Sequence, residues 1–390
     1  MSDLTLTCAG DIFVSPATLA HFVADPTCVE YARTVLQRAD IRFANLESPL
    51  VDSGRALFGT GVRLRSPEET TRLLQFLGID VVTLANNHML DFGRAGLYST
   101  LRELGRSNIA AVGAGRSIEE ARRPIIRTVR GRRIAFLGAC DDQGGGAGRN
   151  RPGVWLLEPR DLISAVHRLR NDADHIVVGL HTGLEFVTCP EPFFLDLAHR
   201  LIDAGACVVV GHHPHVPQGL VRYGNGLIAC SLGDFLFDLP RAPDDMTPRQ
   251  KSFNLLHPLL EIELESAGVA AYRLHLLTRD GMGCYGPAAS RNGFDPEREF
   301  PQLCSLLDDH ERLIEASRRV YAEELYQNLY TVYTAACHAL RCGRTDPLRG
   351  LAWWLGTFRR APKRRFLRQG VLAVARGLSD RWKKGTPSCK

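Results

Sequence analysis

The stretch CVVVGHHPH, residues 207–215, decides how the rest of the sequence is interpreted. A short apolar run that is followed by glycine is typical of a buried strand in a parallel sheet. This run ends directly in histidines, and His213 and His215 are separated by one residue, Pro214. Residues i and i+2 of an extended chain point to the same side. The stretch therefore predicts a buried strand that presents two imidazole groups together, with Pro214 stiffening the backbone between them.

Similar apolar runs recur along the sequence, and longer amphipathic segments lie between them. Segment 66–78 begins Ser66-Pro67 and ends in Gly78, which predicts a helix with Ser66 as its N-cap. Residues 258–278 alternate around a Ser-Ala-Gly turn and predict a β-hairpin that closes a sheet. Strands that alternate with helices predict a layered α/β fold. The further predicted strands are 3–10, 39–47, 79–87, 132–140, 175–183 and 226–237, and the further predicted helices include 158–171 and 191–205.

Polar side chains follow these predicted strands at the point where each strand ends. In open α/β sheets, ligands bind in the crevice beyond the carboxyl ends of the strands. Imidazole nitrogens combined with carboxylate and amide oxygens suit divalent ions such as Zn²⁺, Mn²⁺ or Fe²⁺. Two such ions that share a carboxylate can activate a hydroxide for attack at phosphorus. The residues at these strand ends are Asp11, Glu47, Asn86, Asn87, His88, His181, Glu185, His212, His213 and His215.

These residues lie in short motifs whose order resembles that of a known family. The motifs are GDIFVS (10–15), NLESPL (45–50), LRSPEE (64–69), LANNHMLDFG (84–93), GAG (113–115), HTGLEF (181–186), GHHPHVPQG (211–219) and SLGDFLFD (231–238). Over about residues 3–240 the sequence is similar to the CapA-type poly-γ-glutamate capsule biosynthesis family, which is related to calcineurin-like metallophosphoesterases. The resemblance implies a four-layer βαβα metallophosphoesterase-like sandwich. We place this domain at residues 1–300, because the pattern changes to helical over 301–390.

The resemblance also implies a two-metal site, with Mn, Fe or Zn as the candidate ions. Glu47 would replace the carboxylate that bridges the two metals in ordinary metallophosphoesterases, and Asn87 would bind through its side-chain oxygen. The full set of metal ligands that the resemblance implies is Asp11, Glu47, Asn87, His181, His213 and His215.

Five more residues receive roles around the implied ligands. His88 would be the general acid or the electrostatic partner of the leaving group. Glu185 would either orient the strand-end histidine or act directly in catalysis. Arg65 is expected to contact an anionic substrate. Asn86 and His212 are placed with it as substrate-binding residues, although Asn86 can also form a turn and His212 can also support a ligand.

The sequence shows three departures near these motifs, one from ordinary metallophosphoesterases, which the capsule family shares, and two from the capsule family itself. Ordinary metallophosphoesterases begin Asp-x-His, whereas position 13 is Phe13, so one metal has one imidazole ligand fewer. The family more often has an aromatic residue where this chain has Thr182. It usually has Asn in the SLGNF motif, where this chain has Asp234 and therefore an extra carboxylate near the centre.

Charge is distributed unevenly along the chain. The formal net charge is +5, and residues 341–390 contain 14 Lys/Arg and 2 acidic residues, which leaves −7 on residues 1–340. Trp353, Trp354 and Phe358 lie among the arginines of this tail, a composition that suits anionic membrane surfaces. The basic tail is therefore a solvated helical face, a peripheral membrane contact or a binding surface for an anionic polymer. Nucleic acid is not expected, because no nucleic-acid-binding motif is present.

Targeting signals and cysteines bear on the expected location. We find neither a secretory signal nor an apolar run of about 18–20 residues that would span a bilayer. The 11 cysteines include no CxxC pair, and several stand in apolar strand-like runs. Such cysteines are typical of buried free thiols in a reducing compartment. We therefore expect a cytoplasmic protein, with the inner membrane face as a peripheral location.

Two functions of different classes fit these patterns. The first is a metal-dependent phosphoric ester hydrolase, in which His88 protonates the leaving oxygen. The second is an assembly factor that binds metal and an anionic cell-surface polymer but hydrolyses nothing. A peptidase or amidase that uses the same dinuclear centre is a third, weaker alternative. The substrate and the identity of the metal stay open at this point.

Overall fold

The computed structural model describes residues 3–57, 62–141, 145–237, 248–280, 282–290 and 293–322. The chain divides into two compact units, Met1–Asp308 and Asp309–Lys390. Residues 310–322 of the second unit are helical. The remainder of the predicted helical extension, with the basic tail from 341, lies outside the described residues. Helix α9 (Pro296–Ser305) crosses the position after residue 300 where the sequence pattern changes, and it belongs to the first unit.

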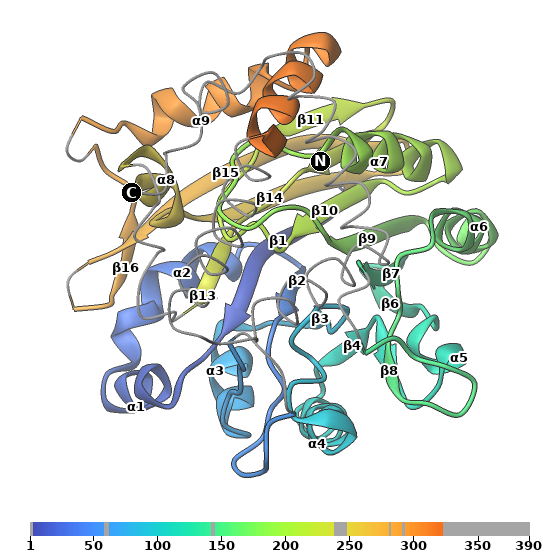
Figure 1. Ribbon diagram of the computed structural model, residues 1–390, viewed down its shortest axis with the longest axis vertical. Coiled ribbons are helices and arrows are strands. Elements are labelled where there is room, and N and C mark those ends of the chain that lie inside the picture. Colours follow the sequence, from blue (N-terminus) through green and yellow to red (C-terminus); the bar gives the residue numbers. More distant parts are fainter. Residues whose placement is uncertain are drawn as a thin grey trace, which may run out of the picture. The chain divides into compact units, whose positions relative to one another are not determined.

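A large mixed sheet forms one half of the first unit (Figure 1). Its central strand is parallel to the next strand of the chain on one side and antiparallel to the predicted hairpin on the other. The hairpin expected at 258–278 is thus confirmed and extends the sheet. The strand order is β16 (Tyr285–Pro287), β15 (Gly268–Arg279), β14 (His257–Glu265), β1 (Leu4–Phe13), β2 (Ile41–Leu46), β3 (Val81–Thr83) and β4 (Ala110–Val112), with β13 (Asp234–Phe237) also paired to β1.

A second, six-stranded sheet forms the other half of this unit. Its middle strands are parallel, so their carboxyl ends lie at one edge. The strand order is β11 (Leu220–Tyr223), β12 (Gly226–Ala229), β10 (Val208–His212), β9 (His175–His181), β7 (Arg132–Cys140) and β6 (Ile125–Val129), and a separate pair is made by β5 (Ala114–Gly115) and β8 (Gly153–Val154).

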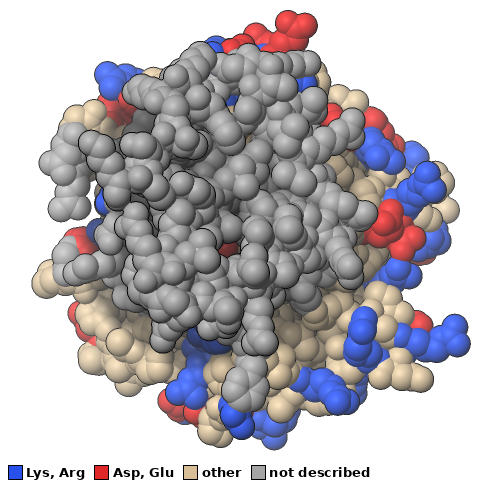
Figure 2. Space-filling model, in the orientation of Figure 1, with Lys and Arg blue, Asp and Glu red and all other residues tan. Residues whose placement is uncertain are grey.

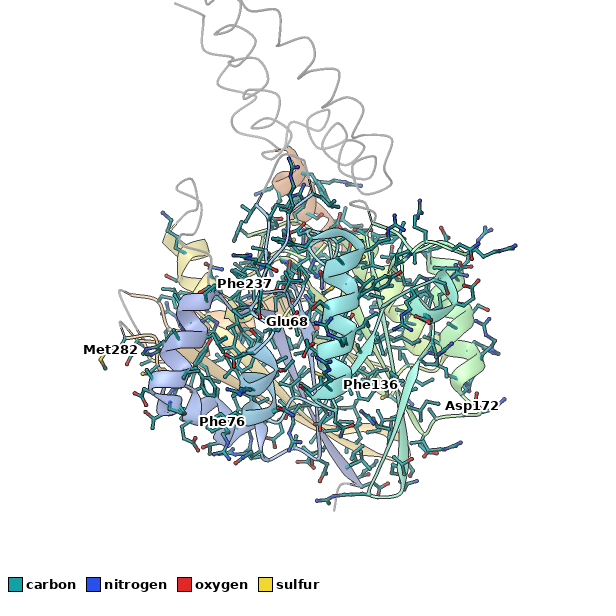
Figure 3. The ribbon with its side chains drawn as sticks, turned by 90° about the horizontal axis from the view of Figure 1, so that it is seen from below. Glu68, Phe76, Phe136, Asp172, Phe237 and Met282 are labelled. Atoms are coloured by element: carbon teal, nitrogen blue, oxygen red, sulfur yellow. The ribbon has the colours of Figure 1, made fainter. Side chains whose placement is uncertain are left out.

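Apolar side chains fill the space between the two sheets and the space under the helices. Phe43 of β2 stacks on Phe136 of β7 with ring centroids 5.5 Å apart, so the two sheets pack face to face. Phe136 lies inside the unit, whereas Met282 is 75% exposed and points away from it (Figure 3). The described helices of this unit are α1 (Pro16–Ala24), η1 (Pro26–Val29), α2 (Glu30–Leu36), α3 (Thr70–Leu77), α4 (Gly93–Arg106), α5 (Ile118–Ala121), α6 (Pro159–Leu169), α7 (Pro192–Ala204), α8 (Pro248–Asn254) and α9.

Helices cover the outer face of each sheet. The leucines of α3, among them Leu73 and Leu77, pack in one cluster with Val82 and Leu84, on the face of the first sheet away from the second. Helix α7 buries Phe194 and Leu201 and lies against β10 of the second sheet (Figure 1). The order is therefore helix, sheet, sheet, helix, and the predicted four-layer α/β sandwich is confirmed.

One predicted helix start was wrong. Helix α3 begins at Thr70, and its N-cap Glu69 makes no side-chain cap hydrogen bond. Ser66 instead lies in extended backbone beside Leu50, where its hydroxyl accepts a hydrogen bond from the Val14 amide at 3.0 Å. The Ser66 side chain therefore hydrogen-bonds to the backbone directly after β1 and does not cap the helix. The predicted end of this helix is confirmed, because Gly78 follows it with a φ of 76°.

The apolar run 226–237 forms two strands in different sheets, not the single strand that was predicted. β12 belongs to the second sheet, and β13 pairs in parallel with β1 of the first. Gly233, with a φ of 62°, lies between them in the left-handed region that glycine adopts readily. This crossing brings Asp234 beside Asp11 in the register of β1 and β13.

The charged side chains on the surface of the first unit are mixed in sign. On the face drawn in Figure 2, blue and red side chains stand next to one another along the right-hand rim. Arg102 contacts Glu68 at 2.9 Å, and Arg106 contacts Glu103 at 2.9 Å. Exposed pairs of this kind contribute little to stability. Among the described residues, no helix has both the length and the apolar character that a membrane span requires.

Two glycines allow strand ends to approach closely just before candidate site residues. Gly10 precedes Asp11, and a methyl group at Gly10 would lie 2.0 Å from the Gly233 carbonyl oxygen. Gly211 precedes His212, and a methyl group there would lie 1.8 Å from the Cys230 carbonyl oxygen. Both obstacles are backbone atoms, which cannot turn away as a side chain can. These glycines of the GD and GHH motifs are therefore packing requirements of the fold.

We expect Gly211→Ala to destabilise the protein by about 2–4 kcal/mol, because the added methyl group forces β10 away from the backbone of Cys230. Gly105→Ala is the matched control: Gly105 lies in α4 with nothing within 4 Å of a methyl group. That change should raise the free energy of unfolding by up to about 1 kcal/mol, through helix propensity. Urea denaturation measures both, and a neutral Gly211→Ala variant would contradict the close approach.

Candidate metal centre

The carboxyl ends of four strands meet at one place in the first unit. Asp11 of β1 is in register with Asn45 of β2, and His181 of β9 is in register with His212 of β10. Glu47 follows β2 directly, and its amide donates a 2.8 Å hydrogen bond to the Ile12 carbonyl. The two sheets therefore contribute carboxylates from one side and imidazoles from the other. This arrangement explains why the strand-end residues converge.

Asp11 is completely buried and is held by hydrogen bonds from both sheets. Its Oδ1 accepts from Asn45 Nδ2 at 2.9 Å and lies 2.8 Å from His212 Nδ1. Its Oδ2 accepts from the backbone amide of His213 at 3.0 Å. A buried carboxylate with this many donors is fixed in orientation before any ligand arrives.

The backbone of the segment after β10 differs from the extended form that was predicted. β10 ends at His212, and His213 and His215 have φ values of 98° and 57°. Non-glycine residues in the left-handed region carry roughly 1–3 kcal/mol of strain each, and such residues cluster at functional sites. A tight turn around Pro214, not extended backbone, therefore brings the two imidazole rings to 6.2 Å between centroids.

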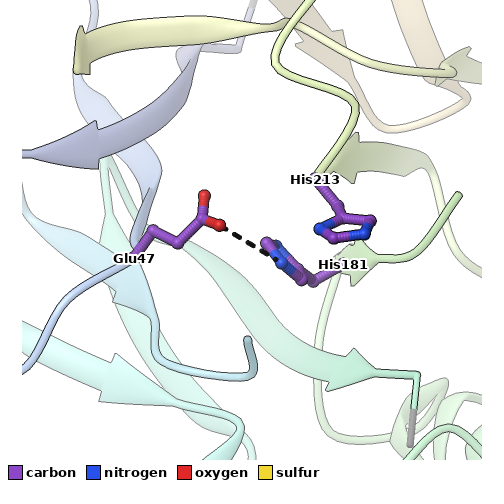
Figure 4. Close-up of side chains that lie close together, drawn as sticks. All are labelled: Glu47, His181 and His213. Atoms are coloured by element: carbon purple, nitrogen blue, oxygen red, sulfur yellow. Dashed lines mark ion pairs between the residues drawn. The ribbon is translucent and has the colours of Figure 1, made fainter. Parts of the chain in front are cut away.

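Glu47 faces His181 and His213, and its carboxylate is directed toward the His181 ring (Figure 4). Its side chain is completely buried, and Oε1 has no hydrogen-bond partner among the described residues. The same atom is 3.5 Å from His181 Nε2 and 3.7 Å from His215 Nε2. A buried carboxylate oxygen without a hydrogen bond is unfavourable unless a positively charged group interacts with it. Of the residues in this cluster, Glu47 therefore has the surroundings that most clearly favour a bound cation.

Donor atoms gather in three groups, in each of which the atoms lie within 4.8 Å of one another. Glu47 is common to two of them, and His213 and His215 are each common to two. In addition, Asn87 Oδ1 lies 2.7 Å from His181 Nε2. The groups are Asp11, Glu47 and His215; Glu47, His181 and His213; and Glu185, His213 and His215.

Burial and close charges shift the protonation of these groups in opposite directions. Burial opposes the charged form of Asp11, but the hydrogen bond and charge of His212 hold the pKa of Asp11 well below its usual range. Burial and the neighbouring Asp11 raise the pKa of Glu47 well above its usual value. Burial lowers the pKa of His215, but Glu47 and Asp234 outweigh it, and the net pKa is well above the usual value. A cation that binds here replaces protons, because its ligands must be deprotonated.

Residues 5–239 match the family model described as bacterial capsule synthesis protein PGA_cap. The chain belongs to this family. The match covers every strand and motif that contributes to the cluster of donor atoms, from Asp11 to Asp234. The predicted resemblance to CapA-type proteins is thereby confirmed.

Several curated proteins are similar to this PGA_cap chain. The capsule biosynthesis protein CapA of Bacillus anthracis is 31% identical over 246 residues, which cover 60% of each chain. The PGA biosynthesis protein CapA of Bacillus subtilis is 34% identical over 213 residues, which cover 54% of this chain and 56% of the relative. A probable polyglutamine synthesis accessory protein of Mycobacterium tuberculosis is 33% identical over 212 residues, with 51% and 56% covered. The chain thus spans less than two thirds of the length of these relatives.

Two solved structures are more distant from the PGA_cap chain. A hypothetical protein from Thermus thermophilus is 19% identical with a TM-score of 0.45, and the match covers 71% of this chain and all of that one. The 5'-nucleotidase of Candida albicans is 12% identical with a TM-score of 0.41, covering 71% and 52%. Likeness at this level says nothing about the activity of this chain.

His88 lies beside the donor cluster but belongs to none of its three groups. Its Nδ1 is 2.7 Å from a carboxylate oxygen of Asp91, and 15% of its side chain is exposed. Asp91 is 2% exposed and also accepts hydrogen bonds from Arg63 at 3.0 Å and from the Leu64 amide at 2.8 Å. The imidazole is therefore fixed through one nitrogen, and in the part of the chain that the structure describes its second nitrogen has no hydrogen bond.

The predicted substrate contacts fall in two different surroundings. Asn86 and His212 are 1% and 0% exposed, and Asn86 Nδ2 donates to the Leu46 carbonyl at 2.8 Å. Both side chains support the strand ends from within, and their predicted contact with substrate stays a prediction. Arg65 is exposed, and its guanidinium contacts the Asp52 carbonyl and the face of Phe92. Its role also stays a prediction.

Glu185 is an exposed member of the donor cluster, in contrast to the buried histidines beside it. Its carboxylate groups with His213 and His215 rather than with His181. Of the two roles predicted for Glu185, direct action at the site fits this position better than orientation of His181. The choice between them stays a prediction.

Three residues of the site received no role from the sequence. Asn45 joins Asp11 to Asn86, because its Nδ2 donates to Asp11 and its Oδ1 accepts from Asn86 at 3.1 Å. Arg63 reaches Asp91 beneath His88. Asn254 of α8 donates to the His215 carbonyl at 2.7 Å. The position of Asn45 inside the NLE motif was a usable signal, whereas Arg63 and Asn254 come from segments without a motif of their own.

Proposed function

We propose that this chain is a divalent-metal-dependent phosphoester hydrolase that takes part in the synthesis of a capsule or poly-γ-glutamate polymer. One observation carries the hydrolase part of the proposal. Oε1 of Glu47 is buried, has no hydrogen bond among the described residues and lies within 4 Å of two histidine nitrogens. A carboxylate oxygen in that position suits a cation, and the oxygen and nitrogen donors suit Mn, Fe or Zn.

The donor groups divide naturally into two metal positions that share Glu47. Asp11, Glu47 and His215 would hold one ion. Glu47, His181 and His213 would hold the other, with Asn87 Oδ1 as an added oxygen ligand beside His181. When bound, the ions supply Lewis-acid polarisation of a phosphoryl oxygen and a bound water of lowered pKa.

The chain itself supplies orientation and a proton donor. Asn45 and His212 hold the Asp11 carboxylate, so that it does not reorganise during the reaction. Asp91 fixes His88 through Nδ1, which leaves Nε2 to deliver a proton to the leaving oxygen. Phosphate-type substrates fit this combination. The bound metal ions would face the phosphoryl group that is transferred, and His88 would face its leaving group.

The polymer part of the proposal rests on the family and its relatives. The names of the Bacillus relatives describe capsule and PGA biosynthesis. The match covers about 60% or less of each of them, so their activities come to this chain as a proposal. An anionic polymer or its phosphorylated precursor is the substrate class that joins both parts. The basic tail from 341, with its proposed membrane or polymer contact, lies outside the described residues.

Metal content tests the proposal first. Purified protein is loaded with Mn²⁺, Fe²⁺ or Zn²⁺, desalted and measured by elemental analysis. We expect about two ions per chain for the wild type and a loss of both in Asp11→Ala with His213→Ala. The matched control is Glu261→Ala with His275→Ala, a carboxylate–histidine pair at 2.9 Å on β14 and β15, which should keep the metal. Wild-type protein that binds no metal would contradict the hydrolase.

A second candidate function is an assembly factor that binds metal and an anionic polymer without hydrolysis. The name of the M. tuberculosis relative, an accessory protein of polyglutamine synthesis, favours it. A screen of phosphoesters with metal-loaded protein separates the two. Hydrolysis that is lost with EDTA and restored by metal supports the enzyme. Metal-loaded protein that retains polymer on a column but hydrolyses no phosphoester supports the assembly factor.

A further inference from the structure

Asp234 has no role in the proposed two-metal centre. It is the first residue of β13, it is 7% exposed, and it belongs to none of the three groups of donor atoms. Its Oδ1 lies 2.8 Å from Nδ1 of His215. On the opposite side of the same ring, Nε2 is 3.7 Å from Glu47 Oε1. The imidazole thus stands between carboxylates: Asp234 is the nearer one at Nδ1, with Asp11 Oδ2 farther away at 3.8 Å, and Glu47 lies at Nε2.

The Asp234 carboxylate is itself held in place from several sides. Pairing of β13 with β1 fixes its backbone opposite Asp11. Its carbonyl oxygen lies 2.9 Å from Nδ1 of His257, and its Oδ2 accepts from Asn254 Nδ2 at 3.3 Å. The backbone of Asp234 is therefore fixed, and its carboxylate cannot turn away from His215 without losing the hydrogen bond from Asn254. A fixed acceptor on one imidazole nitrogen decides which nitrogen carries the proton.

The same surroundings hold His215 against its backbone strain. Its φ of 57° is unusual for a histidine, and Asn254 donates to its carbonyl at 2.7 Å. Phe237 and Phe186 lie 4.6 and 5.7 Å from its ring, between centroids. Phe237 is labelled in Figure 3. The ring therefore packs against two aromatic side chains and is hydrogen-bonded at Nδ1, which restricts the orientation of Nε2.

We propose that Asp234 is a positioning residue for His215: its carboxylate accepts a hydrogen bond from Nδ1–H, which directs the unprotonated Nε2 toward Glu47 and the cation proposed there. The inference rests on the proposed metal centre and adds a residue to it. A carboxylate on the outer nitrogen of a ligating histidine fixes the tautomer and makes the ring a stronger donor. Asparagine, which the family resemblance leads one to expect at this position, would keep an acceptor oxygen but lose the charge.

Metal affinity of three variants tests the inference, measured by competition with a chelator. Partners of ligating residues are worth about 10–100-fold in metal affinity. We expect Asp234→Ala to weaken binding by about that factor. Asp234→Asn should fall between this variant and the wild type. Glu261→Gln, which changes a carboxylate paired with His275 elsewhere on the same sheet, should leave the affinity unchanged.

Ring-nitrogen NMR gives a readout that does not depend on activity. In ¹⁵N-histidine-labelled, metal-loaded protein, His215 should carry a slowly exchanging Nδ1 proton in the wild type and in Asp234→Asn. That signal should be lost in Asp234→Ala. Should Asp234→Ala fail to fold, the isosteric Asp234→Asn still reports the effect of the charge on affinity.

The outcomes separate this inference from the metal centre on which it rests. Weakened binding in Asp234→Ala together with the lost proton signal supports the positioning role. Metal binding by the wild type with an unchanged affinity in Asp234→Ala overturns the role of Asp234 alone. So does a wild-type His215 without a proton on Nδ1. Wild-type protein that binds no metal overturns the proposed centre, and this inference with it.

Discussion

Glu47→Gln is expected to abolish tight metal binding while leaving the metal-free protein at least as stable as the wild type. Glu47 is the residue that both proposed metal positions share. Glutamine keeps the shape of the side chain but removes its charge. We expect metal affinity to fall by more than about 100-fold, since even residues that merely support a ligand are worth 10–100-fold. Hydrolysis should fall with it, and isothermal titration measures the affinity.

In contrast to its metal affinity, the stability of metal-free Glu47→Gln is not expected to fall, and the reason is electrostatic. The Glu47 carboxylate is completely buried, and Asp11 lies close enough to raise its pKa. Glutamine removes the unfavourable burial of that charge beside a second carboxylate. The free energy of unfolding in the presence of a chelator should therefore be unchanged or higher by about 1 kcal/mol or more. Chemical denaturation of both proteins measures it.

A matched substitution separates this effect from the general consequence of replacing a glutamate. Glu261 pairs with His275 at 2.9 Å, and both side chains are mostly buried. Glu261→Gln should keep metal affinity and should lose stability slightly, because it weakens a favourable pair. If Glu47→Gln retained wild-type metal affinity, Glu47 would not be a ligand. If it destabilised the metal-free protein, its carboxylate would already have a favourable partner there.

The strand ends of the site could be predicted because each of them is local in the sequence. Asp11, Glu47 and His181 each follow or end a short apolar run, and a buried parallel strand presents its last residues and the next one or two to the sheet edge. The same logic found the layers of the fold, since strand and helix patterns alternate along residues 3–240. Periodicity and strand order therefore carried most of the architecture.

The parts that were missed depend on contacts between segments far apart in the sequence. Ser66 has the pattern of an N-cap, yet its hydroxyl is used by Val14. Run 226–237 is mostly apolar, yet Gly233 divides it between two sheets. No local pattern reveals that β13 will lie beside β1 and place Asp234 next to His215. Tertiary pairing overrode local propensity at each of these places.

The histidine turn shows a correct result that was reached for the wrong reason. Spacing of two in extended backbone predicted that His213 and His215 point the same way. The two residues are instead left-handed, with φ values of 98° and 57°. Their rings converge because the Asp11 carboxylate binds the His213 amide and Asn254 binds the His215 carbonyl. Strained backbone of this kind is specified by its surroundings, which no single stretch of sequence contains.

His88→Ala is expected to slow phosphoester hydrolysis by about 10²–10⁴-fold without loss of metal. His88 belongs to none of the donor groups, so its removal leaves the proposed ligands intact. Its Nδ1 is fixed by Asp91, and its partly exposed ring can present Nε2 to a leaving oxygen. Steady-state kinetics and elemental analysis on the same preparation measure the two effects. His199→Ala is the control, because His199 stacks on Tyr223 away from the donor groups.

The leaving group decides whether the missing function is proton donation. An alkoxide of high pKa needs a proton as the ester bond breaks, whereas a nitrophenolate does not. The defect of His88→Ala should therefore be large for alkyl phosphates and small for nitrophenyl phosphate. Asp91→Asn should show a weaker form of the same pattern, because it loosens the ring but keeps it. An equal defect for both esters would instead mean that His88 binds the transferring phosphoryl group, and a loss of metal would make His88 a ligand.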